Sequence, residues 1–152
     1  MTFQTPFALL GDALAARGYA APTPVQAAVL EPEAAAPDLI VSAQTGSGKT
    51  VAFGLAMAPE LLNPDGSALP AAAPLALIIA PTRELALQVS RELAWLYEST
   101  GARVATCVGG MDPSKERRAL SYGAQIVVGT PGRLRDHLER GALDLRNLAV
   151  AV

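Results

Sequence analysis

The sequence predicts an α/β domain built on a parallel sheet with helices on both faces. Five short apolar runs alternate along the chain with longer segments whose apolar residues recur at helical spacing. The runs are continuous, as in strands that are buried on both faces of a parallel sheet. Alternation of strands and helices is typical of this fold class. We therefore expect strands at residues 38–43, 75–80, 103–108, 125–129 and 148–152.

Helices are expected both before the first strand and between the strands. Two helical segments precede residue 38, and the first is an amphipathic helix and not a signal peptide, because it lacks a basic start and Asp12 interrupts its apolar part. The later helices are expected at residues 49–62, 82–100, 113–123 and 131–141. The longest of them has one apolar stripe, formed by Leu85, Val89, Leu93 and Leu96. Residues 63–74, rich in Pro and Ala, are expected to form an exposed loop.

Composition restricts the class of protein. The 152 residues suit one domain, and 51% apolar with 17% charged residues exclude a disordered tail. No apolar stretch reaches the roughly 18 residues that a membrane span needs. The net charge of −2 argues against a general nucleic-acid binder, although basic residues outnumber acidic ones over residues 81–152.

One cysteine and one histidine exclude a disulfide framework and argue against a metal site built from these residue types. Cys107 lies in an apolar run and is expected to be a buried, inert thiol. His137 lies among charged residues and is expected to be solvated. The cysteine usage makes the cytoplasm the natural compartment.

The segment Ala43–Thr50, AQTGSGKT, has the pattern of a phosphate-binding loop. It fits G-x-x-x-x-G-K-[ST] except at Ala43, and it joins an expected strand to an expected helix. Gly46 and Gly48 let the backbone turn its N–H groups toward phosphate oxygens, together with those of Gln44, Thr45 and Ser47. Lys49 supplies a charge for the β- and γ-phosphates, and Thr50 offers its hydroxyl to Mg²⁺.

Two further strands run directly into helix starts. Thr82 and Thr130 occupy the expected N-cap positions, and Pro131 follows at the first helical position. Because parallel strands end at one edge of the sheet, these helix starts should lie on one rim with the phosphate loop. They carry Arg83 and Arg133, and Gly109–Gly110 adds a fourth exit. This rim could hold a second polyanion beside a nucleotide, but each arginine is equally compatible with an ordinary capped helix.

Gln26 has two readings. Thr23, Pro24 and Gln26 form a capping box, which is the simpler explanation of the glutamine. Its amide can also donate to and accept from adenine.

Taken in order, GYAAPTPVQ, AQTGSGKT, PTRELA, GG and TPGR resemble the first RecA-like lobe of a DEAD-box ATP-dependent RNA helicase. The resemblance implies a RecA-like P-loop domain, with adenine-recognition helices in residues 1–37 and the α/β core in residues 38–152. It implies ATP and Mg²⁺ as cofactors and RNA as partner. It also places an aromatic residue on adenine; Phe3 is the candidate and Phe7 the other option.

The same resemblance assigns roles to individual residues. Adenine nucleotide would meet Tyr19, Thr23, Gln26 and residues 44–50, with Lys49 and Thr50 taking part in catalysis and Thr50 holding the metal. RNA backbone would meet Pro81, Thr82, Arg83, Gly109, Gly110, Thr130, Gly132 and Arg133.

None of the first four strands ends in an acid that could hold Mg²⁺. In the family, the run 148–152 leads into Asp-Glu-Ala-Asp, which this chain does not contain. We therefore expect a lobe that is incomplete at its C-terminal end, lacks the second lobe and does not turn over ATP. A non-catalytic nucleotide- or RNA-binding module is the alternative, and the codons after Val152 would separate the two. A GTPase is disfavoured, because no Asn-Lys-x-Asp motif is present.

Overall fold

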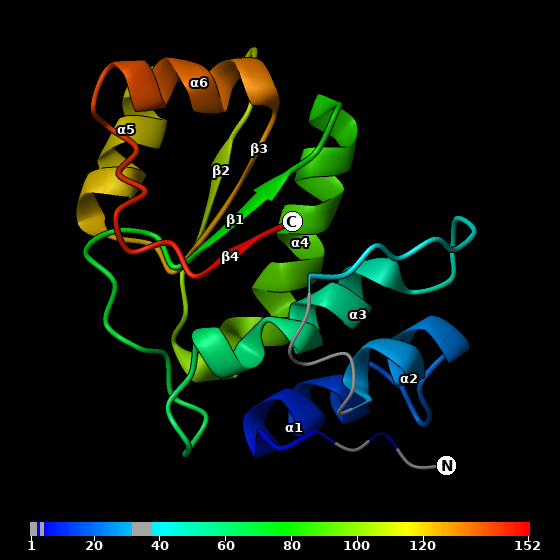
Figure 1. Ribbon diagram of the computed structural model, residues 1–152. Helices are drawn as coiled ribbons and strands as arrows, with labels where there is room; N and C mark the ends of the chain where they lie inside the picture. Colours follow the sequence, from blue (N-terminus) through cyan, green and yellow to red (C-terminus); the bar gives the residue numbers. More distant parts are fainter. Residues whose placement is uncertain (1–2, 4, 32–37) are drawn as a thin grey trace.

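The computed structural model describes residues 3, 5–31 and 38–152 as an α/β fold (Figure 1). Its α-helices are α1 (Ala8–Ala16), α2 (Pro24–Leu30), α3 (Lys49–Ala56), α4 (Arg83–Tyr97), α5 (Pro113–Tyr122) and α6 (Pro131–Glu139). The strands are β1 (Ala76–Ile79), β2 (Val104–Cys107), β3 (Ile126–Gly129) and β4 (Val150–Ala151), and short 3₁₀ turns follow α3 and α4 at Ala58–Glu60 and Glu98–Thr100.

The four strands form one parallel sheet in the order β2-β3-β1-β4. Strand β1 pairs with β3 over its whole length, from Ala76 opposite Ile126 to Ile79 opposite Gly129. Strand β4 contributes only two paired residues, both against β1. The predicted parallel sheet is confirmed, and every expected strand from residue 75 onward is present in a shortened form.

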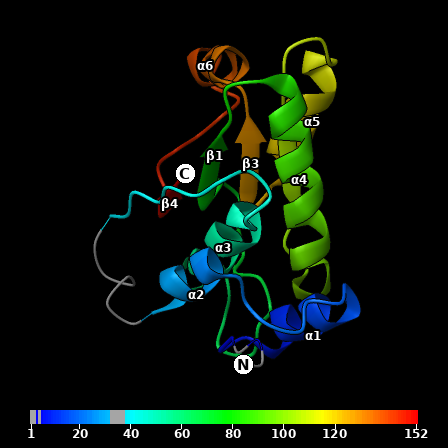
Figure 2. The same ribbon diagram turned by 90° about the vertical axis from the view of Figure 1, so that its right-hand side faces the viewer.

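The sheet separates two apolar cores. Alternate residues of a strand point to opposite faces, so Ile78 and Val128 join the larger core with α1, α3 and α4. Leu77 and Val127 join the smaller core with α5 and α6. Figure 2 shows α4 running alongside the sheet, with α1 at the C-terminal end of α4 and α2 beside α3. Helices on both faces explain why the strand sequences are continuously apolar.

The strand predicted at residues 38–43 is absent, and this prediction was wrong. The segment carries no strand assignment, and Leu39, Ile40 and Val41 are exposed, with Ile40 fully accessible at 101%. A strand needs a neighbour that supplies ladder hydrogen bonds. Segment 38–43 pairs with no strand of the sheet, and β4, at the sheet edge, is ordered into the ladder over two residues only.

Two smaller expectations also need correction. The loop 63–74 is not uniformly exposed, because Ala71 and Ala73 are buried and the loop carbonyl of Leu69 accepts a hydrogen bond from Gln125 Nε2 at 3.0 Å. On α4, Val89, Leu93 and Leu96 are buried as predicted, but Leu85 is 41% exposed. Leu85 lies in the first turn of α4, beside the loop that leaves β1.

An aromatic cluster joins the start of the chain to the end of α4. The ring of Tyr19 stacks on Trp95 with 5.7 Å between centroids, and the Arg17 guanidinium lies 4.8 Å from the centre of the same indole. These contacts fix the segment between α1 and α2 against the core. None of the described helices has the length and apolar character needed to cross a membrane.

Candidate functional site

The phosphate loop precedes α3, as predicted, although no strand leads into it. Gly46 and Gly48 have φ angles of 82° and 87°, which only glycine adopts easily. Lys49, the first residue of α3, donates from Nζ to the carbonyl of Ala43 and so closes the loop on itself. Ser47 Oγ is buried without a hydrogen-bond partner among the described residues. The loop therefore places an unpartnered buried hydroxyl, an exposed lysine and backbone amides at one helix start.

Two side chains of the N-terminal end of α2 hydrogen-bond the phosphate loop. The predicted capping box is confirmed: Thr23 Oγ1 accepts from Gln26 N–H at 3.4 Å, and Gln26 Oε1 accepts from Thr23 N–H at 2.9 Å. Both side chains also reach the loop, where Thr23 Oγ1 donates to the Ser47 carbonyl at 2.7 Å and Gln26 Nε2 donates to the Gly48 carbonyl at 3.2 Å. Gln26 is fully buried, so its simpler reading as a capping residue holds in this structure. One N–H and one lone pair of its amide make no hydrogen bond among the described residues, but the side chain is enclosed, so a ligand would reach them only if α2 or the phosphate loop moved.

The aromatic candidates for adenine packing lie in different environments. Phe7 immediately precedes α1 and is buried in the larger core. Phe3 is only half-buried, and its N–H donates to the Ala20 carbonyl at 3.3 Å. Tyr19 is half-buried against Trp95. Of the two phenylalanines, Phe3 therefore has the side chain surface left for a ligand.

The two threonines predicted as N-caps behave differently. Thr82 Oγ1 accepts from Leu85 N–H at 3.2 Å and caps α4 as expected. Thr130 occupies the N-cap position of α6 with extended backbone, and Pro131 is the first helical residue, but the Thr130 side chain makes no capping bond. Its hydroxyl is therefore not committed to the helix.

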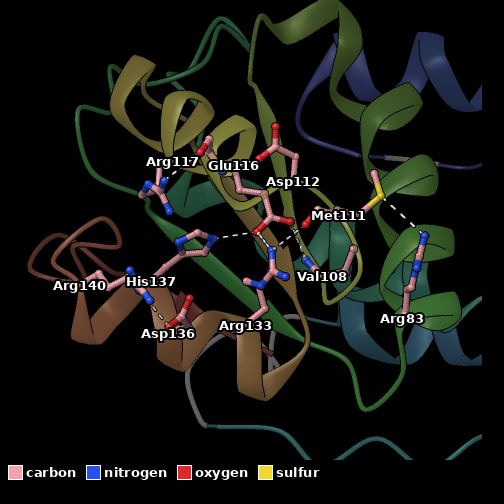
Figure 3. A network of polar contacts seen from close by, with 11 residues as sticks. Arg83, Val108, Met111, Asp112, Glu116, Arg117, Arg133, Asp136, His137 and Arg140 are labelled. Carbon is pink, nitrogen blue, oxygen red and sulfur yellow. Dashed lines mark hydrogen bonds and ion pairs between the residues drawn. The ribbon is translucent and has the colours of Figure 1, made fainter.

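Three of the four predicted loops meet at one edge of the sheet (Figure 3). Arg83 Nη2 lies 3.7 Å from Met111 Sδ, and Arg133 Nη1 donates to the Met111 carbonyl at 3.2 Å. Gly110 has a φ of 81°, and a methyl group in place of its hydrogen would lie 2.5 Å from Arg83 Nη1. The exposed residues of this edge include Pro81, Thr82, Gly109, Gly110 and Gly132.

The phosphate loop and this edge are separate in their contacts. Among the described residues, no hydrogen bond joins the loop 43–50 to the residues around Arg83, Gly110 and Arg133. The phosphate loop is hydrogen-bonded to α2 instead, whereas the loops that follow β1, β2 and β3 contact one another. Convergence is thus observed for the three loops expected to meet RNA, while their sharing of one rim with the phosphate loop stays a prediction.

The sequence did not predict the buried pair of Glu116 and His137 that lies beside Arg133 at this edge. His137 was expected in solvent, yet it is completely buried, and its Nε2 lies 2.7 Å from Glu116 Oε1. Glu116, on α5, is only 6% exposed, and no motif in the sequence points to it. His137 lies three residues after Leu134 on α6, so both side chains lie on the face of the helix that packs against the smaller core. The charged residues next to His137 in the sequence hide this spacing.

Cys107 is buried as predicted. Burial, with a smaller contribution from the nearby Glu116 carboxylate, raises the pKa of its thiol to about 12, and the Arg133 guanidinium acts in the opposite direction. The thiol therefore stays protonated and unreactive in the folded protein.

Comparison with known proteins gives a consistent result. The family model described as "DEAD/DEAH box helicase" matches residues 23–152. The chain is 45% identical to "ATP-dependent RNA helicase DeaD" of Escherichia coli over 154 residues, which is 97% of this chain and 24% of that protein. It is 42% identical to "DEAD-box ATP-dependent RNA helicase 9" of Oryza sativa subsp. japonica, covering 91% of this chain and 22% of that protein.

Solved structures show the same similarity. A hypothetical ATP-dependent RNA helicase from Sulfolobus tokodaii matches 95% of this chain and 40% of its own with a TM-score of 0.80 and 28% identity. A variant of Saccharomyces cerevisiae Dbp5, bound to RNA and ADP BeF3, matches 94% of this chain and 34% of its own with a TM-score of 0.75 and 27% identity. Both neighbours support a RecA-like helicase domain. The chain spans about a quarter of the length of these two curated relatives.

Proposed function

Because the chain belongs to the DEAD/DEAH box helicase family, we propose that it forms the N-terminal lobe of an ATP-dependent RNA helicase. In this proposal the lobe binds an adenine nucleotide at the phosphate loop and RNA backbone at the edge around Arg83 and Arg133. The parent protein couples ATP hydrolysis to the opening of RNA duplexes. The observation that carries the proposal is the contact of Gln26 and Thr23 with the phosphate loop, because it connects the predicted base and phosphate sites directly.

The phosphate site uses the chemistry of a helix start. Backbone amides of residues 44–48 and the N-terminus of α3 would face the phosphates. Lys49 would leave the Ala43 carbonyl and bind the β- and γ-phosphates, since a charged oxygen is a stronger acceptor than a carbonyl. Thr50, in the first turn of α3, would present its hydroxyl to Mg²⁺, which neutralises phosphate charge when bound.

The adenine site would lie beside α2. The N–H and lone pair of the Gln26 amide that bond neither Thr23 nor Gly48 suit the N6 and N7 edge of adenine, and adenine would reach them once the loop over this buried side chain moves aside. Phe3 and Tyr19 would supply apolar surface for the base. Because the other half of the Gln26 amide already bonds Thr23 and Gly48, base recognition would be transmitted directly to the phosphate loop.

The RNA site would recognise backbone and not base sequence. Two arginines, exposed glycine backbone and the uncommitted Thr130 hydroxyl are donors that suit phosphate oxygens, and such contacts carry no sequence information. We expect binding of single-stranded RNA that weakens as salt rises, because phosphate contacts release counterions.

We further propose that residues 1–152 alone do not turn over ATP, since no described strand delivers an acidic residue beside the phosphate loop. A non-catalytic nucleotide- or RNA-binding module is the second candidate, and the same observation favours it. A cytoplasmic location stays a prediction.

Nucleotide binding is tested with a fluorescent ATP analogue displaced by ATP or GTP. Lys49→Ala should weaken binding by about tenfold or more, because a charge-assisted hydrogen bond contributes about 1.5–3 kcal/mol. Equal displacement by ATP and GTP would refute the adenine assignment. Phosphate release that is abolished by Lys49→Ala would show genuine turnover and refute the inactivity of this chain.

RNA binding is tested by the anisotropy of a labelled single-stranded oligouridine at several salt concentrations. Arg83→Ala should lower the salt slope by about 0.7, the value for one lost contact to single-stranded phosphate. Arg91→Ala, which removes an exposed arginine two turns further along α4, is the matched control. If both variants bind alike, the edge around Arg83 is not the RNA site.

A further inference from the structure

One buried carboxylate connects the elements that carry the proposed RNA-binding loops. Glu116 lies in the first part of α5 and is 6% exposed. Its Oε1 accepts from Arg133 Nη1 at 2.9 Å and lies 2.7 Å from His137 Nε2, while its Oε2 accepts from Val108 N–H at 3.0 Å (Figure 3). Val108 immediately precedes Gly109–Gly110. A single side chain thus joins the start of that loop to the first two turns of α6.

The anchoring of Arg133 leaves a defined part of its guanidinium for a ligand. Both hydrogens of Nη1 are engaged, one by Glu116 Oε1 and one by the Met111 carbonyl. Among the described residues, Nε and Nη2 have no hydrogen-bond partner. Those two nitrogens form one edge of the planar guanidinium, and two parallel N–H groups match two oxygens of a phosphate. The arginine is therefore held by one edge with the other edge unoccupied.

His137 completes the environment of the carboxylate. It is fully buried, its Nδ1 has no partner among the described residues, and its Nε2 faces Glu116. Donation to Glu116 requires the proton on Nε2, and a neutral ring of this tautomer avoids an unpartnered N–H at Nδ1. The carboxylate then balances one guanidinium, with side chains only 5% and 14% exposed, and no second charge is buried.

We propose that Glu116 is a positioning residue for RNA binding. It fixes Nη1 of Arg133 so that the Nε and Nη2 edge faces a backbone phosphate. Through Val108 it also holds the Gly109–Gly110 loop at the same site, and His137 keeps the carboxylate in place. This inference rests on the RNA-binding function proposed above.

A metal site is the competing use of the same residues. Cys107, Glu116 and His137 place a thiol, a carboxylate and an imidazole within 4.8 Å of one another. This set suits Zn²⁺, but the Arg133 guanidinium already occupies Glu116 Oε1 and would repel a dication. The geometry therefore favours the anchored arginine.

The functional test is a double-mutant cycle on the chain of 152 residues. The variants are Glu116→Ala, Arg133→Ala and their combination, with Glu139→Ala as the matched control, because it removes an exposed ion pair to Arg135 on the same helix. Each single variant should weaken binding of labelled oligouridine by about five- to tenfold, and the double variant no more than either single one. Affinity for the fluorescent ATP analogue should stay within about twofold. Additive losses, or an equal loss of nucleotide binding, would overturn the proposal.

Glu116→Gln tests whether the carboxylate acts as an acceptor, and it keeps the shape of the side chain if Glu116→Ala does not fold. It retains one acceptor oxygen for Arg133 and should bind RNA more tightly than Glu116→Ala. If both folded variants bind RNA equally weakly, the acceptor oxygen for Arg133 does not support RNA binding, and the proposal is wrong.

A structural readout separates this inference from the RNA-binding function. Amide exchange at Gly109, Gly110 and Met111 should rise by about tenfold in Glu116→Ala and stay unchanged in Glu139→Ala. The single histidine gives an unambiguous ¹⁵N spectrum, which should show the Nε2–H tautomer and should not respond to added Zn²⁺. Unchanged exchange, or a Zn²⁺-dependent histidine signal, would overturn the inference. Failure of the wild type to bind oligouridine, with exchange responding as expected, would refute RNA binding and leave the anchoring supported.

Discussion

Replacing Gln26 by methionine tests the link between base recognition and the phosphate loop. The change keeps the length of the side chain but removes the bonds to Thr23 N–H at 2.9 Å and to the Gly48 carbonyl at 3.2 Å. Each neutral hydrogen bond contributes about 0.5–1.5 kcal/mol net, so the pair contributes about 1–3 kcal/mol. Burial of the thioether at this fully enclosed position recovers part of that. We expect a net loss of about 1–2 kcal/mol in the free energy of unfolding.

Two assays follow this variant. Thermal unfolding should show a Tm lower by about 2–8 °C, the range expected for this loss in a chain of this size. Competition binding should show a lost preference for ATP over GTP, because the methionine offers adenine neither a donor nor an acceptor. The control is Gln88→Met, since Gln88 is exposed on α4.

The two readouts test different links. An unchanged Tm would mean that the buried amide does not stabilise the loop. A retained preference for ATP would mean that another group reads the base. A Tm loss of equal size in Gln88→Met would show that the effect is not specific to the capping box.

Three further changes have defined outcomes. Lys49→Ala should leave Tm unchanged while nucleotide affinity falls, because Lys49 is exposed; a large Tm loss in calorimetry would contradict this. Gly54→Ala should lower stability by about 1–3 kcal/mol in urea titration, since the new methyl would lie 2.9 Å from Leu96 Cδ2, and a gain would show that helix propensity wins. Burial raises the pKa of Cys107 to about 12 from an ordinary value of 9.0, so the unfolded chain loses the thiol proton at lower pH than the folded chain does. The free energy of unfolding should therefore fall between about pH 9 and 12. Full reactivity of the thiol with a thiol reagent at neutral pH would contradict its burial.

Hydrophobic patterning was sufficient for the part of the fold that is internally paired. Strands β1 and β3 are continuous apolar runs, and both neighbours of each lie within the chain, so local sequence and tertiary pairing agree. The run 38–43 has the same local character, but pairing is a property of the neighbours and not of the run itself. The sequence alone does not show that segment 38–43 lies outside the described ladder.

The candidate site was predictable where a motif ties chemistry to backbone geometry. The capping box of α2 and the glycine turns of the phosphate loop follow from residue type and spacing. The pairing of Glu116 with His137 joins residues 21 positions apart on different helices. No local pattern predicts a contact between residues so far apart in the sequence. The charged residues on either side of His137 favoured a solvated histidine, whereas its neighbours on the same face of the helix favoured a buried one.

The stacking of Tyr19 on Trp95 has a practical consequence. The chain has a single tryptophan, and its indole contacts both the Arg17 cation and Tyr19, a residue of the predicted adenine site. Any movement of the segment between α1 and α2 on nucleotide entry would alter the surroundings of this one fluorophore. The protein therefore carries an intrinsic optical reporter, and its emission can follow ligand arrival in real time without a label.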